Sequence, residues 1–394
     1  MGSKVKLGII GFGLATSAVV GPLTEGERYE VVACADPDPL SRERFVARYG
    51  SVAYESAEEL FDKAALDAVY IATPTRLHEA LTQMAFDHGV HVLVEKPIST
   101  SLDAAERMVA AAEAAGLVLM VNHKHSADRD VLGMWQLTRS GQLGRVRAVH
   151  RWHYTDWFYR SRADDERDPS VGGVVLRQGA HEFDMLRMLV PSVATSLRGW
   201  TGDWDASRPG EGAFHAFVEC EDGTVISTIH SGYDRFRTEE FLLGPIDPEI
   251  TGSSRRNLAG TSAEEEHLLK RTVGHPKPEG AETGVYGMTL MSCDGGDLRT
   301  SPGGGVWLYD DSGRHELKAS GPSGTEVIVG ELYDAITSGV APLHDGSWGL
   351  AVLELCLAIR ESQSVGGEVK LHRQRAVDWS SADRVIGERV MSAP

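Results

Sequence analysis

The stretch VKLGIIGFGLAT, residues 5–16, joins an apolar run to a turn with two glycines. The apolar run, Val5 to Ile10, has the length and composition of a buried β-strand. Gly11 and Gly13 then allow a tight turn, after which a helix is expected to begin. A strand, a glycine turn and a helix in this order are typical of the first unit of a doubly wound parallel sheet.

The rest of the first 122 residues repeats this alternation. Short apolar runs predict four more buried strands, and the segments between them predict helices. This pattern favours parallel β-α-β units with right-handed crossovers. We therefore expect an α/β fold with a Rossmann domain, a doubly wound parallel sheet, over residues 1–122. The expected strands are 31–35, 68–72, 91–94 and 117–121, and the expected helices are 41–49, 57–63, 78–88 and 102–115.

The pattern changes after residue 122. Runs at 146–154, 213–219, 225–231 and 306–309 alternate in the way that half-exposed antiparallel strands do. Residues 123–394 are therefore predicted to form an α+β domain for substrate binding and oligomerisation, with a largely antiparallel open sheet. Residues 347–362 predict a late helix. Residues 245–284 are rich in Pro, Gly and charge, which predicts an extended loop or insertion that either caps a site or joins an interface.

Composition excludes several classes of partner. The chain has 394 residues and a formal charge of -18, which disfavours nucleic acid and anionic membranes. No apolar run approaches the length of a membrane span, and we expect a cytoplasmic protein. The four cysteines lack the spacing of a zinc site or a disulfide framework. They are Cys34, Cys220, Cys293 and Cys356.

The glycine turn and the second strand predict a dinucleotide site. Backbone N–H groups of Gly11-Phe12-Gly13-Leu14 would face a pyrophosphate at the start of a helix. Asp36, at the end of the second strand, could accept hydrogen bonds from ribose hydroxyls and would repel a 2′-phosphate. NAD is thus favoured over NADP, although Arg42 leaves NADP open. The alternative is that Asp36 merely caps a turn before Pro37.

Polar residues follow the next two strands at the edge where ligands bind in such sheets. Thr73 and Pro74, with His78 shortly after them, are expected to line the nicotinamide side of the crevice. Glu95 and Lys96 follow a buried strand directly, so Lys96 is expected to face cofactor and substrate. The alternative is an ion pair in water at the strand end.

These motifs together resemble the glucose-fructose oxidoreductase and inositol dehydrogenase family (Gfo/Idh/MocA). The resemblance rests on Gly11-x-Gly13, Asp36, Ala72-Thr73-Pro74, Glu95-Lys96-Pro97 and GGVVLRQGAHEFD at 172–184. Stretches such as YTDWFYR at 154–160 and LHDG at 343–346 are similar to the phthalate cis-dihydrodiol dehydrogenase branch. The resemblance implies that Lys96 and His181 stand beside the reacting carbinol. It also implies an aspartate four residues before the histidine, where this chain has Arg177.

We therefore hypothesise an oxidoreductase that moves a hydride between a secondary alcohol carbon of a small cyclic substrate and NAD. Lys96 would act as general base or hydroxyl-polarising donor, and His181 would orient or relay, unless it is a buried structural histidine. Arg177 suggests an anionic substrate, because a guanidinium binds a carboxylate bidentately. Alternatively, Arg177 pairs with an acid such as Asp184.

Further expectations concern the surroundings of this site. Tyr154, Arg160 and His125 are candidate substrate contacts. His123 and His125 lack a third ligand at a suitable spacing, so no metal is expected. A sheet with one uncovered face, together with the family resemblance, predicts a homodimer or homotetramer.

Two rival functions stay open at this point. One is a sugar, inositol or glycoside dehydrogenase, including an enzyme that oxidises its substrate transiently with bound NAD. The other is a non-catalytic dinucleotide sensor. Arg177 in place of the usual aspartate supports the sensor, whereas Lys96 and His181 together oppose it.

Overall fold

The computed structural model describes residues 4–13, 16, 19, 21, 23, 26–160, 168–244, 258, 260–272, 286–322, 324–378 and 391–392. Leu14 and residues 245–257, 259 and 273–284 of the expected loop lie outside this description. The chain divides into two compact units. The first comprises Met1–Lys124, Thr325–Leu353 and Trp379–Val385, and the second comprises His125–Gly324, Glu354–Asp378 and Ile386–Pro394.

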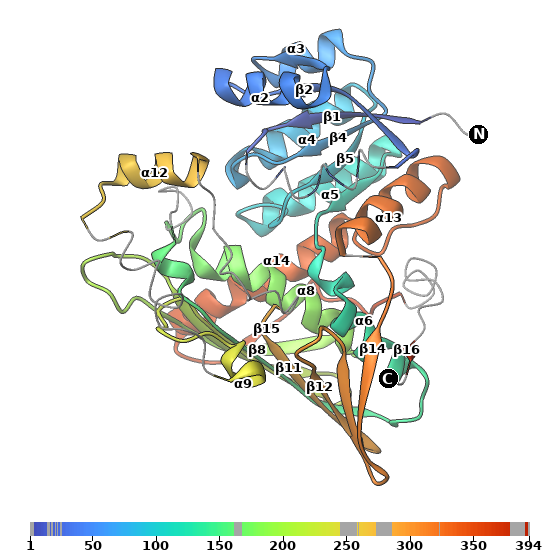
Figure 1. The fold of residues 1–394 in the computed structure, drawn as a ribbon, viewed down its shortest axis with the longest axis vertical. Coiled ribbons are helices and arrows are strands. Elements are labelled where there is room, and N and C mark those ends of the chain that lie inside the picture. Colours follow the sequence, from blue (N-terminus) through green and yellow to red (C-terminus); the bar gives the residue numbers. More distant parts are fainter. Residues whose placement is uncertain are drawn as a thin grey trace. The chain divides into compact units, whose positions relative to one another are not determined.

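The first unit contains the expected parallel sheet. Its six strands lie in the order β3-β2-β1-β4-β5-β6, and every neighbouring pair is parallel. The order reverses at β1 and β4, which makes the sheet doubly wound and confirms the predicted fold class. The strands are β1 (Val5–Ile10), β2 (Tyr29–Ala35), β3 (Val52–Tyr54), β4 (Ala68–Ile71), β5 (His91–Val94) and β6 (Leu119–Val121) (Figure 1).

Side-chain caps fix where three of its helices begin. Asp38, Ser56 and Ser101 each accept a hydrogen bond from a backbone N–H in the first turn of the helix that follows. Such caps pair donors that the helix itself leaves free. The helices of this unit are α2 (Pro39–Tyr49), α3 (Ala57–Lys63), α4 (His78–Asp87), α5 (Leu102–Ala115) and α13 (Gly324–Ser338).

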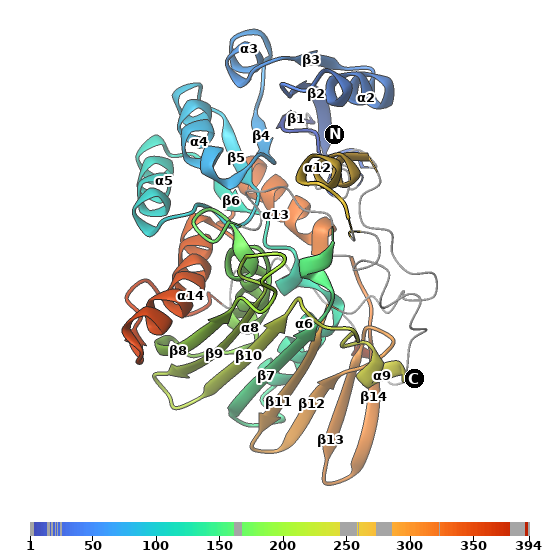
Figure 2. The same ribbon diagram turned by 90° about the vertical axis from the view of Figure 1, so that its left-hand side faces the viewer.

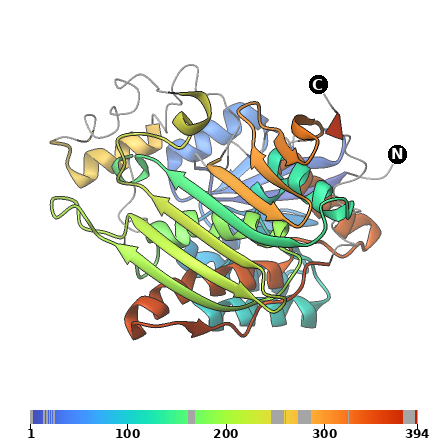
Figure 3. The same ribbon diagram turned by 90° about the horizontal axis from the view of Figure 1, so that it is seen from below.

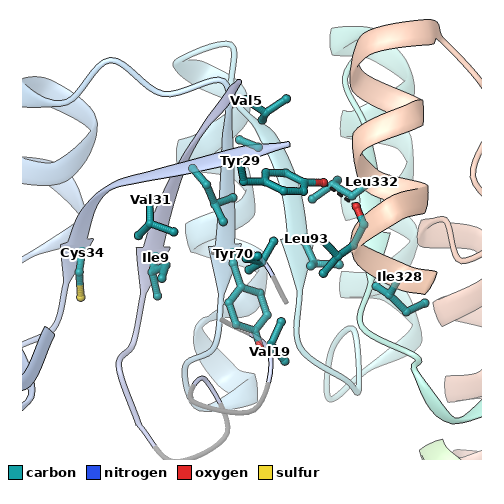
Figure 4. Packing of buried hydrophobic residues seen from close by; sticks show 14 of the residues in the cluster. Val5, Ile9, Val19, Tyr29, Val31, Cys34, Tyr70, Leu93, Ile328 and Leu332 are labelled. Atoms are coloured by element: carbon teal, nitrogen blue, oxygen red, sulfur yellow. Dashed lines mark hydrogen bonds between the residues drawn. The ribbon is translucent and has the colours of Figure 1, made fainter. Parts of the chain in front are cut away.

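A helix from late in the chain completes the core of the first unit. Ile328 and Leu332 of α13 belong to the same buried cluster as Ile9 and Leu93 of the parallel sheet (Figure 4). The Tyr29 hydroxyl donates a hydrogen bond of 2.6 Å to the Val329 carbonyl. Residues 325–353 therefore pack as part of the N-terminal fold.

The second unit is built on a mixed, mostly antiparallel sheet. Its ten strands lie in the order β15-β8-β9-β10-β7-β11-β12-β13-β14-β16. The pair of β10 and β7 is parallel, and the other pairs are antiparallel. The strands are β7 (Val146–Tyr154), β8 (Ala194–Gly202), β9 (Ala213–Cys220), β10 (Val225–Ser231), β11 (Met288–Cys293), β12 (Gly296–Thr300), β13 (Val306–Asp310), β14 (Gly313–Ala319), β15 (Val369–Lys370) and β16 (Met391–Ser392).

Helices lie on one face of this sheet. Figure 2 shows α6 (Arg129–Arg139) and α8 (Ala180–Leu189) on the same side of the strands. The strand alternation sends Arg151 and His153 of β7 toward α8, where both contact Glu182. Seen from the opposite side, no helix of the described chain crosses the middle of the sheet (Figure 3). Trp200 and Phe217 are both 41% exposed.

Two further helices lie late in the chain. The long helix α14 (Gly346–Val365) begins in the first unit and continues into the second. The short helix α12 (Ala263–Thr272) lies in the segment expected to be a loop or insertion. Among the helices in the described ranges, none combines the length and hydropathy needed to cross a lipid bilayer.

Candidate functional site

The turn after β1 requires glycine at its first position. Gly11 has a φ of 87°, and a Cβ added there would lie 2.6 Å from the Ala72 carbonyl oxygen. A Cβ at Gly13 would meet no described atom within 4 Å, so the described residues leave this side of the turn open. The Thr16 hydroxyl donates to the Gly11 carbonyl at 2.7 Å. Thr16 occupies the position of the usual third glycine, and its hydrogen bond connects the end of the turn to its first residue.

The Asp36 carboxylate is fixed beside this turn. Its Oδ2 accepts a hydrogen bond of 2.7 Å from the Phe12 N–H, and its Oδ1 accepts one of 2.8 Å from the Asp38 N–H. A carboxylate has about four acceptor positions, so capacity is left for a ligand hydroxyl. Arg42 donates to the backbone carbonyls of Asp36 and Pro37, at 2.7 and 2.9 Å.

These features fit a dinucleotide. The open space at Gly13 suits a pyrophosphate, and the remaining lone pairs of Asp36 suit ribose hydroxyls. In addition, the buried Thr73 hydroxyl after β4 has no hydrogen-bond partner among the described residues. Buried hydroxyls in folded proteins are normally paired, so Thr73 is available to a cofactor.

The loops after β4 and β5 are held together by a buried histidine. His78 Nε2 lies 3.1 Å from the Thr73 carbonyl oxygen, and its Nδ1 lies 3.1 Å from that of Pro97. Burial lowers the pKa of this imidazole. Glu95 accepts hydrogen bonds of 2.5 Å from the Tyr70 hydroxyl and from the side-chain amide of Asn122. The backbone on both sides of the half-buried Lys96 is therefore held in place.

In the second unit, a buried ion pair shapes the entry to α8. Gly173 has a φ of 74°, and a Cβ added there would lie 2.7 Å from Glu211 Oε1. Glu211 pairs with Arg360 at 2.8 Å and accepts a hydrogen bond from the Val175 N–H. The chain then forms a π-helix, η4 (Val175–Gly179), that runs directly into α8. Such π-turns occur frequently at functional sites.

His181, at the start of α8, lies in a group of aromatic rings. Its ring meets that of His125 edge to face, with centroids 4.5 Å apart. Tyr286 stacks on His125 at 4.3 Å and lies 5.5 Å from His181. The Tyr286 hydroxyl also donates to the side-chain oxygen of Gln178. The half-buried Arg177 stands in the same π-helix, four residues before His181.

His125 is fixed in turn by two aspartates. Its Nδ1 lies 2.6 Å from Asp128 Oδ2. The next residue, Ser126, donates its backbone N–H to Asp184 on α8 at 2.8 Å, and Asp184 is fully buried. Asp184 therefore holds the short helix η2 (His125–Ala127) against α8 and keeps His125 beside His181.

A second histidine cluster lies next to His181 along the chain. Glu182, fully buried, contacts the Arg151 guanidinium through Oε2, while its Oε1 lies 2.8 Å from His153 Nδ1 and 3.3 Å from His230 Nδ1. Burial opposes ionisation of Glu182, but Arg151 and the two imidazoles outweigh it and hold its pKa well below the ordinary value. Burial also lowers the pKa of His153 to about 3.

The residue types of this cluster are those of a metal centre. His153, Glu182 and His230 place ligand atoms within 4.8 Å of one another, the one such group in the described part of the chain. However, Arg151 occupies the second oxygen of Glu182 and cancels its charge. Both Nδ1 atoms already face Oε1. We therefore interpret the cluster as a neutral hydrogen-bonded network, which a divalent cation would have to disrupt.

The structure brings together some of the residues singled out in the sequence and separates others. His125 joins His181, and Arg177 precedes it in the same helical segment. Tyr154 instead contacts Phe236 and Phe241, with ring centroids 5.3 and 6.2 Å away. Arg160 bonds to Asp156 and Thr155, at 3.0 and 2.7 Å. Tyr154 and Arg160 thus contact side chains other than those of the group around His181.

Four residues at this site were not identified from the sequence. Tyr286 lies outside any pattern of spacing that indicates a site. Asp128 follows His125 by three residues, and this His-x-x-Asp spacing was the available signal. Gln178 and Glu182 both lie inside the motif at 172–184, but their types and spacing indicate no role by themselves.

A doubly wound parallel sheet with a glycine turn after its first strand and a carboxylate at the end of its second strand is typical of dinucleotide-binding proteins. Comparison with known families agrees. Residues 5–123 match the oxidoreductase family with an NAD-binding Rossmann fold, GFO_IDH_MocA, and residues 131–252 match the GFO/IDH/MocA C-terminal domain.

Individual relatives extend this match over the whole chain. The chain is 31% identical to the 1-carboxy-3-chloro-3,4-dihydroxycyclohexa-1,5-diene dehydrogenase of Comamonas testosteroni, covering 97% of this chain and all of that protein. It is 28% identical to an NADP-dependent D-xylose 1-dehydrogenase of Haloferax volcanii over 66% of this chain and 79% of that protein. The chain is also similar to a crystal structure described as a dehydrogenase from Bordetella bronchiseptica RB50. The identity is 33% and the TM-score is 0.85, over 93% of this chain and all of the Bordetella chain.

The chain belongs to the GFO/IDH/MocA oxidoreductase family. It is therefore an NAD(P)-dependent dehydrogenase that acts on CH–OH groups, and the resemblance noted from its motifs is confirmed.

Proposed function

We propose that this enzyme oxidises a carboxylated cyclic cis-dihydrodiol. The observation that carries the proposal is the position of Arg177, in the π-helix that leads to His181 and four residues before it. Residues four apart on a helix share a face, and a guanidinium binds a carboxylate with two parallel hydrogen bonds. The Comamonas relative acts, by its name, on a carboxylated dihydroxycyclohexadiene.

The reaction separates one C–H and one O–H bond of a secondary alcohol. When bound, the nicotinamide accepts the hydride from carbon. The hydroxyl proton goes to the protein, and we assign its transfer to Lys96 as general base or polarising donor and to His181 as the group that orients or receives. In this assignment, residues 1–122 supply the nucleotide site and Lys96, while residues 123–394 supply His181 and Arg177.

We further propose NAD rather than NADP as the cofactor. The Asp36 carboxylate is fixed by two backbone N–H groups at the edge where an adenosine ribose would lie. A fixed negative charge there attracts ribose hydroxyls and repels a 2′-phosphate. Arg42, the nearby cation, is engaged with the carbonyls of Asp36 and Pro37.

The remaining proposals concern assembly and location. The open face of the second sheet exposes Trp200, Trp204 and Phe217, and we propose that a second copy covers it to form a homodimer or homotetramer. Light scattering of the wild type and of Phe217→Asp tests this, with dissociation expected in the variant.

The four free cysteines suit a reducing compartment, and we propose the cytoplasm.

The test of the substrate class is a panel assay of NADH formation. It compares carboxylated cis-dihydrodiols with dihydrodiols that lack the carboxylate, and with inositols and pyranosides. Turnover that requires the carboxylate supports the proposal. Turnover of sugars alone favours the rival function of a sugar dehydrogenase. The similarity to the D-xylose enzyme supports that rival.

A further inference from the structure

The group around His181 contains the Asp128 carboxylate, which contacts the His125 imidazole, and His125 in turn contacts His181. Asp128 Oδ2 lies 2.6 Å from His125 Nδ1, and the His125 ring meets His181 edge to face at 4.5 Å. The carboxylate, the first imidazole and the second imidazole thus follow one another within one unit. Both members of the Asp128–His125 pair are partly exposed, 23% and 15% by side chain.

Contacts from several elements hold this arrangement in place. Asp184 holds the backbone of η2 through Ser126, and Tyr286 stacks on the face of His125 with an interplanar angle of 19°. The Tyr286 backbone carbonyl is itself held by Arg151. His125 therefore keeps its Nδ1 toward Asp128 while its ring stays against His181.

Proton transfer to His181 creates a need for such a carboxylate. In the proposed complex the Arg177 guanidinium and the substrate carboxylate compensate each other, so neither balances a further charge. When His181 takes the substrate proton it becomes an imidazolium, which needs another negative charge close by. Asp128, acting through His125, supplies that charge.

We propose that Asp128 and His125 are positioning residues that stabilise protonated His181 during turnover. The proposal rests on the proposed role of His181 in proton transfer. This step is a proton transfer, so no oxidation state changes in it. The proton leaves the substrate hydroxyl, resides on His181 and later passes to water, while the Asp128–His125 pair offsets the charge. The other charged groups nearby are Arg177 before His181, Asp184 on α8, the adjacent Glu182–Arg151 pair, and the buried Asp130, whose pKa the charge of Asp128 helps to raise.

The test is the pH profile of kcat/KM for wild type and Asp128→Asn. Removing the negative charge makes protonated His181 less stable. We therefore expect the acid limb to move to lower pH by about one unit, with kcat about tenfold lower. Asp128→Glu should restore most of the profile. The matched control is Asp310→Asn, because Asp310 pairs with His315 at 3.4 Å on β13 and β14. Asp310→Asn should leave the profile unchanged.

Two results overturn the proposal. One is a profile of Asp128→Asn that superimposes on that of the wild type. The other is a uniform loss of activity with an unmoved acid limb, which a purely structural role would give.

If the wild type oxidises nothing on the panel, the proposed function fails, and NMR decides the inference separately. The imidazole titration of His181 in the cofactor-free protein should then move to lower pH in Asp128→Asn. An unmoved titration overturns the inference.

Discussion

The rings of His125 and Tyr286 stack with their centroids 4.3 Å apart, although the first residue follows β6 and the second precedes β11. Through this contact and its hydrogen bond to Gln178, Tyr286 connects η2 to the π-helix before His181. We predict that Tyr286→Phe, which keeps the ring and removes the hydroxyl, lowers kcat/KM by about tenfold, the effect of one lost hydrogen bond. Tyr286→Ala should lower it further, because His125 also loses its support. Equal kinetics for Tyr286→Phe and the wild type would show that the hydrogen bond from Tyr286 to Gln178 does not contribute to catalysis.

The role of Arg177 predicts a loss of substrate affinity. Arg177→Ala should raise KM for a carboxylated dihydrodiol by about 10- to 100-fold and change kcat little, because charged hydrogen bonds contribute about 1.5 to 3 kcal/mol. Arg177→Lys should restore part of this loss, since an ammonium cannot form both parallel bonds. Steady-state kinetics measure the effect. An unchanged KM in Arg177→Ala would show that the arginine does not bind the substrate.

The position of Asp36 predicts the cofactor preference. Asp36→Ser should lower kcat/KM for NAD by about tenfold and raise that for NADP, because the repulsion of a 2′-phosphate is removed. Assays with both cofactors measure the ratio. Since Asp36 also accepts bonds from Phe12 and Asp38, thermal unfolding of the variant serves as the control for folding. A wild type that prefers NADP would contradict the assignment.

Asp130 predicts a pH-dependent stability. Burial raises its pKa from 3.8 to about 6. The folded state therefore binds this proton more tightly than the unfolded state, and the free energy of unfolding falls as pH rises from about 4 to about 6. Asp130→Asn keeps an acceptor for the Thr300 hydroxyl and removes the charge.

The comparison of two pH values isolates this effect. Relative to the wild type, Asp130→Asn should gain about 1 to 3 kcal/mol between about pH 4.5 and about pH 7.5, as measured by urea unfolding. A difference between the two proteins that is the same at both pH values would contradict the prediction.

The cluster around Glu182 predicts indifference to metals. Because Arg151 balances the Glu182 carboxylate, dialysis against a chelator should leave activity unchanged, and added zinc should not increase it. Metal analysis of the purified protein checks this directly. One equivalent of metal that is retained by the wild type and lost in His153→Ala would overturn the interpretation.

Local patterns predicted much of the fold. The helices at 57–63 and 102–115 have the expected bounds because Ser56 and Ser101 cap them, and caps are local signals. By contrast, the packing of Ile328 and Leu332 into the N-terminal core joins residues 300 apart in the chain, as in the bond from Tyr29 to Val329. No periodicity predicts such a contact. The parallel pairing of β10 with β7 is likewise set by tertiary packing.

The candidate site was predictable to the extent that it rests on motifs. His181, Lys96 and the glycine turn follow from short sequence patterns. Tyr286 does not, because its role depends on a contact with His125 across the fold. In the sequence, Glu182 looks like an ordinary polar residue of a helix. Only the structure shows that its carboxylate is buried and paired with the Arg151 guanidinium.

The proposed reaction is tested by NADH formation from a carboxylated cis-dihydrodiol, measured for the wild type and for Lys96→Met. We expect turnover by the wild type, at least about 100-fold less by the variant, and unchanged NAD binding in both, because general acid–base groups contribute about 10²- to 10⁴-fold. Near-normal turnover by Lys96→Met would contradict the assignment of Lys96. Wild-type protein that binds NAD and oxidises neither dihydrodiols, inositols nor sugars would contradict the proposed dehydrogenase function.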